Sequence, residues 1–162
     1  MRYALTVLAL VLTISGLHQL AQLYAFAWVS KAGGSLPITG FFNLVEVWNP
    51  GISFGMFHSL TYGQWLLSVL ALGISLALIL WLSRVGNPYR AWAVGFIVGG
   101  AIGNTIDRIR YGAVADYLDF HLHGYHWPAF NVTDAAICLG VMLLVAEKPF
   151  RRTYFTSKAV KG

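Results

Sequence analysis

Residues 64–83 read QWLLSVLALGISLALILWLS, a run of twenty positions without a charged side chain. About 20 apolar residues are enough for a helix to cross the hydrocarbon core of a membrane. The following segment, RVGNPYR at residues 84–90, ends the run with two arginines, a glycine and a proline. This stretch therefore predicts a transmembrane helix followed by a tight hairpin loop.

Three further apolar runs flank this helix, over about residues 3–29, 91–107 and 130–146. Hydrophobic residues make up 57% of the 162 positions and charged residues only 10%, whereas a soluble domain has about 25% charged residues. We therefore predict one integral membrane domain over residues 1–162, all-α within the membrane, with four transmembrane helices. A cleaved signal peptide is the alternative for the first run, but that run is longer than the usual apolar core of such a peptide.

A different pattern occupies residues 30–63, which mix glycine, proline, serine and aromatic residues. The stretch from Phe41 to Phe57 partly alternates and contains a Trp-Asn-Pro-Gly turn signal at residues 48–51. It predicts a small β-rich cradle outside the membrane. Trp48, Phe54 and Phe57 are expected to lie at the apolar interface, either as part of this cradle or simply as membrane anchors.

Basic residues set the orientation of a membrane protein, because retained cytoplasmic loops collect Lys and Arg. If the amino terminus is cytoplasmic, Lys31, Arg108 and Arg110 lie outside. The other eight of the eleven basic residues then lie inside: Arg2, Arg84, Arg90, Lys148, Arg151, Arg152, Lys158 and Lys161. The sequence thus predicts that both termini are cytoplasmic.

Four of the six acidic residues, Asp107, Asp116, Asp119 and Asp134, fall between the end of the third span and the start of the fourth. The predicted topology places them at the outer interface, where a carboxylate needs a partner, a cavity or a chemical role. Asp134 precedes a lipid-type apolar run, so it is either functional or a first-turn acid that complements the helix dipole. We favour a functional role.

Two carboxyl groups that lie close together share a proton, so that one activates water while the other protonates a carbonyl. A competing site is a metal centre in the loop that contains Asp119, His121, His123 and His126, although its spacing matches no helical zinc motif. Histidines mixed with Tyr and Trp are more typical of an interfacial belt. The Gly95, Gly99, Gly103 ladder, with Gly100 beside it, predicts close helix packing.

Three segments resemble those of the lipoprotein signal peptidase family, also called signal peptidase II. They are GGAIGNTIDR at 99–108, GAVAD at 112–116 and WPAFNVTD at 127–134, and FFNLVEVWNPGISFG at 41–55 is similar to the family's first extracytoplasmic stretch. The resemblance implies an aspartic endopeptidase whose catalytic dyad falls on Asp116 and Asp134. Substrate-binding or dyad-supporting roles are then implied for Asn49, Asn104, Asp107, Arg108 and Asn131, with no metal and no cofactor.

The same resemblance implies the partners and the location. The substrates would be diacylglyceryl-modified prolipoproteins, cut on the amino side of the lipidated cysteine, and nucleic acid would have no part. The protein would act as a monomer in the bacterial inner membrane, in contact with lipid, with its active site at the outer leaflet. The alternative is a non-enzymatic membrane scaffold, which would need neither aspartate, or a small transporter, whose acids would lie nearer the membrane midplane.

The first helix departs from the family's usual Asp-Gln-x-x-Lys pattern, because this chain has His18-Gln19-Leu20-Ala21-Gln22. Loss of one member of a buried charged pair strands the other, whereas replacement of both can be nearly neutral. We interpret the change as a replaced structural pair. Thr133 stands where the family usually has alanine.

Overall fold

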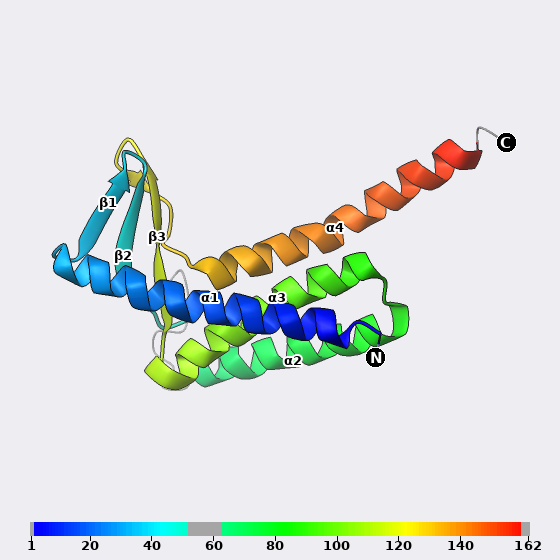
Figure 1. Cartoon of the computed structure of the whole chain (residues 1–162), viewed down its shortest axis with the longest axis horizontal. Helices are drawn as coiled ribbons and strands as arrows, with labels where there is room; N and C mark the ends of the chain where they lie inside the picture. Colours follow the sequence, from blue (N-terminus) through cyan, green and yellow to red (C-terminus); the bar gives the residue numbers. More distant parts are fainter. Residues whose placement is uncertain (1, 52–62, 160–162) are drawn as a thin grey trace.

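The computed structural model describes residues 2–51 and 63–159, with side chains described up to Glu147. The helices are α1 (Ala4–Lys31), α2 (Gly63–Val85), α3 (Pro88–Tyr111) and α4 (Val132–Ala159). The strands are β1 (Ser35–Thr39), β2 (Phe42–Asn49), β3 (Val114–Leu122) and β4 (Tyr125–His126). The strands gather at one end of the helices, while α1 begins and α4 ends toward the opposite end (Figure 1). Phe54 and Phe57 lie outside the described residues.

The helices expose many large apolar side chains and bury several small or polar ones. In α2 the buried residues are Gly63, Ser68, Ser75 and Leu82, whereas in α1 the side chain of Leu5 is 81% exposed. Exposure of this kind over whole helices is unfavourable in water and ordinary in lipid. Among the described residues, α1 and α2 are long and apolar enough to cross a membrane. The predicted runs at 91–107 and 130–146 form parts of α3 and α4, and their assignment as spans stays a prediction.

Helix α3 lies against α1, α2 and α4, and its glycines allow the close approach. A Cβ atom at Gly95 or Gly99 would meet side chains of α1, and one at Gly100 or Gly103 would meet Thr133 of α4. Small residues four apart let helix backbones come together in this way. The predicted glycine packing is therefore confirmed.

The sheet is antiparallel, with strand order β1-β2-β3-β4. The predicted cradle supplies β2, whereas its neighbour β3 comes from the segment that follows α3. Gly112 ends α3 in the left-handed conformation, with φ +75°, so that the chain turns directly into β3. Trp48 of β2 packs against Phe26 of α1 and Tyr111 of α3. These contacts fix the sheet on the helix ends and bring Asp116 over them.

Candidate active site

The start of α4 is held by a reciprocal cap between Asn131 and Asp134. The Oδ1 atom of Asn131 accepts hydrogen bonds from the backbone N–H groups of Thr133 and Asp134, at 2.8 and 3.0 Å. In return, Oδ2 of Asp134 accepts one from the Asn131 backbone N–H at 3.2 Å. This is the geometry of a capping box. Asp134 thus has the capping role that the sequence allowed, and its second oxygen points to other partners.

Asp116 is buried near the start of β3, with 2% of its surface exposed. Its carboxylate accepts hydrogen bonds from two side-chain amides, Nδ2 of Asn49 at 3.0 Å and Nδ2 of Asn131 at 2.8 Å. Asn49 reaches it from the neighbouring strand β2, and Asn131 from the start of α4. The strand and the helix therefore meet at this carboxylate.

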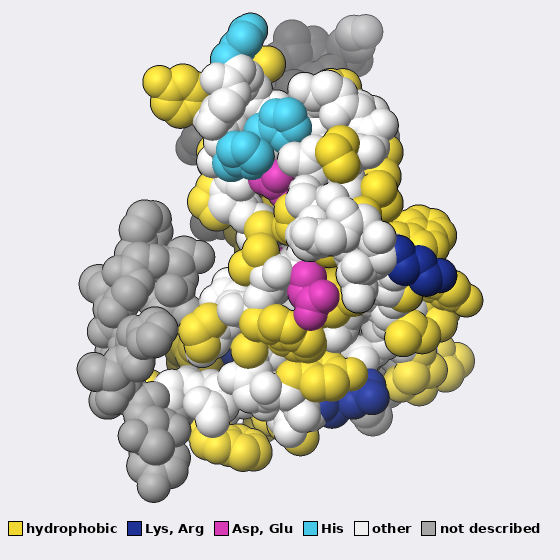
Figure 2. Space-filling model, turned by 90° about the vertical axis from the view of Figure 1, so that its left-hand side faces the viewer, with side chains coloured by type: hydrophobic (Ala, Val, Ile, Leu, Met, Phe, Trp, Pro, Cys, Tyr) yellow, Lys and Arg dark blue, Asp and Glu magenta, His cyan; other side chains and the backbone are white. Residues whose placement is uncertain are grey.

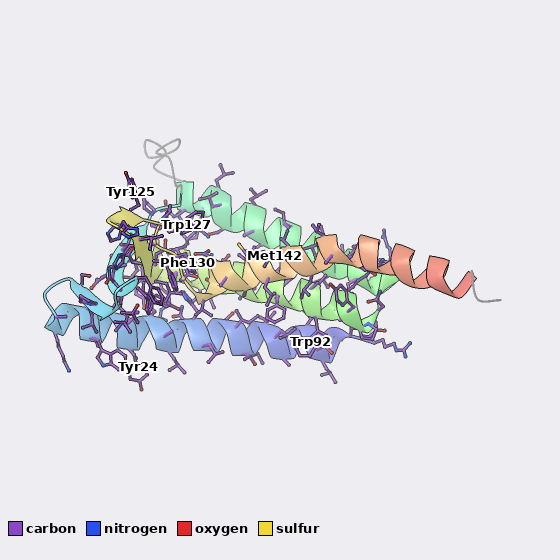
Figure 3. The ribbon with its side chains drawn as sticks, turned by 90° about the horizontal axis from the view of Figure 1, so that it is seen from above. Tyr24, Trp92, Tyr125, Trp127, Phe130 and Met142 are labelled. Atoms are coloured by element: carbon purple, nitrogen blue, oxygen red, sulfur yellow. The ribbon has the colours of Figure 1, made fainter. Side chains whose placement is uncertain are left out.

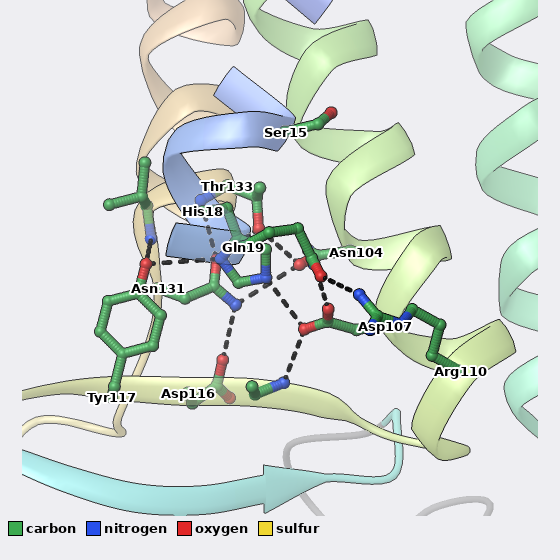
Figure 4. A network of polar contacts seen from close by, with 12 residues as sticks. Ser15, His18, Gln19, Asn104, Asp107, Arg110, Asp116, Tyr117, Asn131 and Thr133 are labelled. Carbon is green, nitrogen blue, oxygen red and sulfur yellow. Dashed lines mark hydrogen bonds and ion pairs between the residues drawn. The ribbon is translucent and has the colours of Figure 1, made fainter. Parts of the chain in front are cut away.

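The amides of Asn104 and Asn131 connect the two aspartates, and Figure 4 shows the part of this network that joins Asn104, Asn131 and Asp116. Asn104 of α3 donates to Oδ1 of Asp134 at 2.8 Å, and its own oxygen lies 3.4 Å from the Asn131 amide. The hydroxyl of Thr133 donates to Oδ1 of Asn104 at 2.5 Å and also contacts the oxygen of Asn131. Asp116 and Asp134 consequently lie in one buried polar network supplied by three elements.

Burial raises the pKa of Asp116 to about 6, from an ordinary value of 3.8. The hydrogen bonds from Asn49 and Asn131 oppose this shift, while the charge of Asp134 adds to it. The carboxyl group thus titrates not far below neutral pH, in the range where an acid or base is useful in catalysis. Such a perturbed carboxyl group beside a second one is a candidate for proton transfer.

Asp107 lies beneath the sheet, fully buried, and is bound by α1 and β3 together. Its Oδ2 accepts hydrogen bonds from Nε2 of His18 at 2.9 Å and from the backbone N–H of Ala115 at 3.1 Å. Its Oδ1 accepts one from the Gln19 amide at 2.6 Å. The guanidinium group of the next residue, Arg108, interacts electrostatically with the carboxylates of Asp134, Asp116 and Asp107. Its buried Nε atom has no hydrogen-bond partner among the described residues.

Asp119 belongs to a separate cluster on the sheet. It accepts hydrogen bonds from Asn43 and from Nδ1 of His126, both at 2.9 Å, and the ring of His121 stacks on that of His126. Burial alone would raise the pKa of Asp119, but these hydrogen bonds and the histidine charges lower it overall. Figure 2 views the molecule from the end that carries the sheet and shows histidine side chains gathered in the upper part of this view. Within residues 2–51 and 63–147, no group of three or more His, Cys, Asp or Glu is arranged to hold a metal.

An exposed apolar helical bundle with a buried polar site at its sheet end is the architecture of a membrane enzyme. Two solved structures, both described as bacterial membrane enzymes, have this fold. One has a TM-score of 0.76 at 22% identity and covers 93% of this chain and 92% of its own. The other has a TM-score of 0.77 at 25% identity and covers 89% and 92%.

The particular family follows from the sequence comparisons. A family model described as signal peptidase (SPase) II matches residues 7–150. The lipoprotein signal peptidase of Ralstonia nicotianae is 46% identical over 136 residues, which are 82% of this chain and 75% of the relative. That of Oleidesulfovibrio alaskensis is 43% identical over 134 residues, 81% of this chain and 86% of the relative. The chain belongs to the signal peptidase II family, and the comparisons give no support to a scaffold or a transporter.

The structure brings most of the predicted site residues into one place. Asn49, Asn104 and Asn131 contact the two aspartates directly, and Asp107 contacts the backbone next to Asp116. Sequence reasoning did not identify His18 and Gln19 as partners of Asp107. The available signal was a polar pair within a long apolar helix, because a polar side chain at that depth needs a partner.

Proposed function

We propose that this protein is an aspartic endopeptidase that removes signal peptides from diacylglyceryl-modified prolipoproteins, with Asp116 and Asp134 as its catalytic dyad. The observation that carries the proposal is the network in which Asn131 binds the carboxylate of Asp116 and caps α4 together with Asp134. The names of the relatives, lipoprotein signal peptidase, supply the substrate class.

The chemistry requires one ionised and one protonated carboxyl group. The ionised group takes a proton from water, whose oxygen attacks the carbonyl carbon of the scissile peptide bond. The protonated group donates its proton to the carbonyl oxygen, and a tetrahedral diol forms. Collapse of the diol breaks the C–N bond: the amine leaves with a proton from one aspartate, and a diol hydroxyl gives its proton to the other as the new carboxyl group forms. The pKa of about 6 for Asp116 suits such sharing of one proton between two groups.

The location of the site fits a substrate anchored in lipid. The proposed arrangement has four spans, formed by α1, α2, α3 and α4, with the sheet at the outer leaflet of the inner membrane and both termini in the cytoplasm. Aromatic side chains support it, since Tyr24, Tyr125 and Trp127 lie toward the sheet end and Trp92 toward the other (Figure 3). Aromatic residues are enriched at the two membrane–water interfaces.

The deciding experiment replaces each aspartate by asparagine, which keeps shape and removes the ionisable group. Asp116→Asn and Asp134→Asn should each reduce cleavage of a lipid-modified prolipoprotein by more than about 10³-fold, and the double variant should be hardly worse, because such residues act as a unit. The matched control is Asp119→Asn on the same strand, which should cleave at close to the wild-type rate.

A chelator arm distinguishes the dyad from metal chemistry. Activity should persist in EDTA, because a carboxylate and not a metal activates the water. Substantial cleavage by Asp116→Asn or Asp134→Asn would refute the dyad. Loss of activity in EDTA that zinc restores, together with a defective Asp119→Asn variant, would assign the chemistry to the histidine cluster instead.

A further inference from the structure

His18 occupies a central position beneath the sheet, although the proposed reaction does not use it. It lies in α1, is fully buried, and its two ring nitrogens face two different elements. Nε2 donates to Oδ2 of Asp107 in α3 at 2.9 Å, and Nδ1 lies 3.4 Å from the hydroxyl of Tyr117 in β3. The imidazole ring also stacks on the Tyr117 ring, with centroids 5.9 Å apart.

Both contacts lead to the chain neighbours of Asp116. Oδ2 of Asp107, which binds His18, also accepts the backbone N–H of Ala115 at 3.1 Å. Tyr117 follows Asp116 directly, and its hydroxyl accepts the backbone N–H of Val132 at 3.4 Å, in the first turn of α4. One imidazole therefore touches the supports on both sides of Asp116 and, through Tyr117, the turn that contains Asp134.

We propose that His18 is a positioning residue of this enzyme, which fixes the backbone on both sides of Asp116 through Asp107 and Tyr117. The inference rests on the proposed catalytic role of Asp116. A misplacement of about 1 Å in a catalytic group can cost about 100-fold in rate, so a residue that only holds the strand can control turnover. Such a residue affects kcat more than KM, because it does not touch the substrate.

Two conservative replacements separate the two contacts. In glutamine the amide nitrogen is as many bonds from the backbone as Nε2 of histidine, so His18→Gln keeps a donor for Asp107. In asparagine the amide nitrogen corresponds to Nδ1, so His18→Asn keeps a polar atom near Tyr117 and loses the donor to Asp107. Ser15→Ala is the matched control, because Ser15 is also a buried polar residue of α1 bonded to α3, through the Gly99 carbonyl oxygen at 3.2 Å.

The measurement is kcat and KM for a lipid-modified prolipoprotein in lipid nanodiscs, with the melting temperature of each variant. We expect His18→Gln to retain kcat within about threefold and His18→Asn to lose at least about tenfold, with KM within about twofold in both. Ser15→Ala should match the wild type in kcat. Equal kcat for His18→Gln and His18→Asn, or a loss confined to the melting temperature, would overturn the inference.

Two additions keep the test decisive. If His18→Asn does not fold, Tyr117→Phe takes its place, since it removes the hydroxyl that contacts His18 and Val132. It should lower kcat at unchanged KM, and a wild-type kcat would overturn the inference. Asp116→Asn is measured in parallel: if it cleaves, the proposed dyad fails, whereas an inactive Asp116→Asn beside a fully active His18→Asn refutes the positioning role alone.

Discussion

The two amide donors on Asp116 govern how readily its carboxyl group loses its proton. Burial raises its pKa, and the hydrogen bonds from Asn49 and Asn131 hold that rise in check, because they stabilise the ionised form. Each amide comes from a different element, so the pKa of Asp116 depends on the docking of β2 and of α4. Removal of either donor should raise the pKa above about 6.

Asn49→Ala tests the effect of a donor on the pKa of Asp116, because Asn49, unlike Asn131, takes no part in the cap of α4. Without its amide the pKa of Asp116 rises, so its carboxyl group keeps its proton up to a higher pH. Because the active dyad holds one proton, the kcat/KM profile should move to higher pH, with the apparent constants belonging to the pair of aspartates. Asn43→Ala is the control, because Asn43 makes the same kind of contact to Asp119 at 2.9 Å. A kcat/KM profile that is unchanged in Asn49→Ala would contradict the role of this amide.

Residue patterns predicted the asparagines of the site better than its histidine. The segments around Asn104 and Asn131 resemble family motifs, so the position of these two asparagines beside the aspartates was expected. Their role in catalysis stays a prediction. His18 departs from the family's pattern, and its partner Asp107 lies 89 positions away. A local pattern shows that a buried polar residue needs a partner, but only the packing of α1 against α3 shows which one.

Among the helices, α3 is the one whose packing depends most on glycine, because a Cβ atom at several of its glycines would meet a neighbouring helix. A Cβ atom at Gly100 would press on the Thr133 carbonyl oxygen and the Ile137 side chain of α4. A backbone oxygen cannot move aside as a side chain can, so the two helices would have to separate. Since Thr133 immediately precedes Asp134, such a separation would also displace the site.

Gly100→Ala should therefore destabilise the protein by about 1–3 kcal/mol, the usual cost of overpacking, and lower its activity. Gly73→Ala in α2 is the control, because a Cβ atom there meets nothing within 4 Å. Alanine is favoured over glycine inside a helix by up to about 1 kcal/mol, so Gly73→Ala should be neutral or stabilising. Thermal unfolding in detergent measures both, and equal melting temperatures would contradict the packing argument.

The sequence predicted elements where the hydrophobic pattern was clear and missed one where charged residues interrupt the pattern. The uncharged run at residues 64–83 forms the body of α2, and the alternating stretch after Phe41 forms β2. Strand β3 was not predicted, because its residues Val114–Leu122 include two aspartates and a histidine that hide the β-pattern. Its place beside β2 is set by long-range pairing, such as Trp48 with Ala115.

For the whole molecule, the proposed topology makes a direct prediction about which loops face the cytoplasm. The hairpin between α2 and α3 and the sheet lie at opposite ends of the helices (Figure 1). Arg84, in the last turn of α2 beside the hairpin, is exposed. Tyr125, in strand β4 of the sheet, is 84% exposed. With both termini inside, these two residues should lie on opposite sides of the membrane.

Single cysteines at these positions, in a Cys138→Ser background, provide the measurement. A membrane-impermeant maleimide applied to spheroplasts should label Tyr125→Cys at once and Arg84→Cys only after the membrane is opened. The reverse pattern would invert the orientation. Labelling of both positions before opening would refute a four-span arrangement.

The two aspartates that share one polar network lie on elements that leave the ribosome at different times. Asp116 belongs to β3, but Asp134 belongs to α4, and its partner Asn131 immediately precedes that helix. A nascent chain that has already inserted α1, α2 and α3 therefore holds only half of the proposed dyad. Proteolytic capacity would then arise only when α4 enters the bilayer, so a nascent chain without α4 would not cleave its neighbours in the translocation machinery.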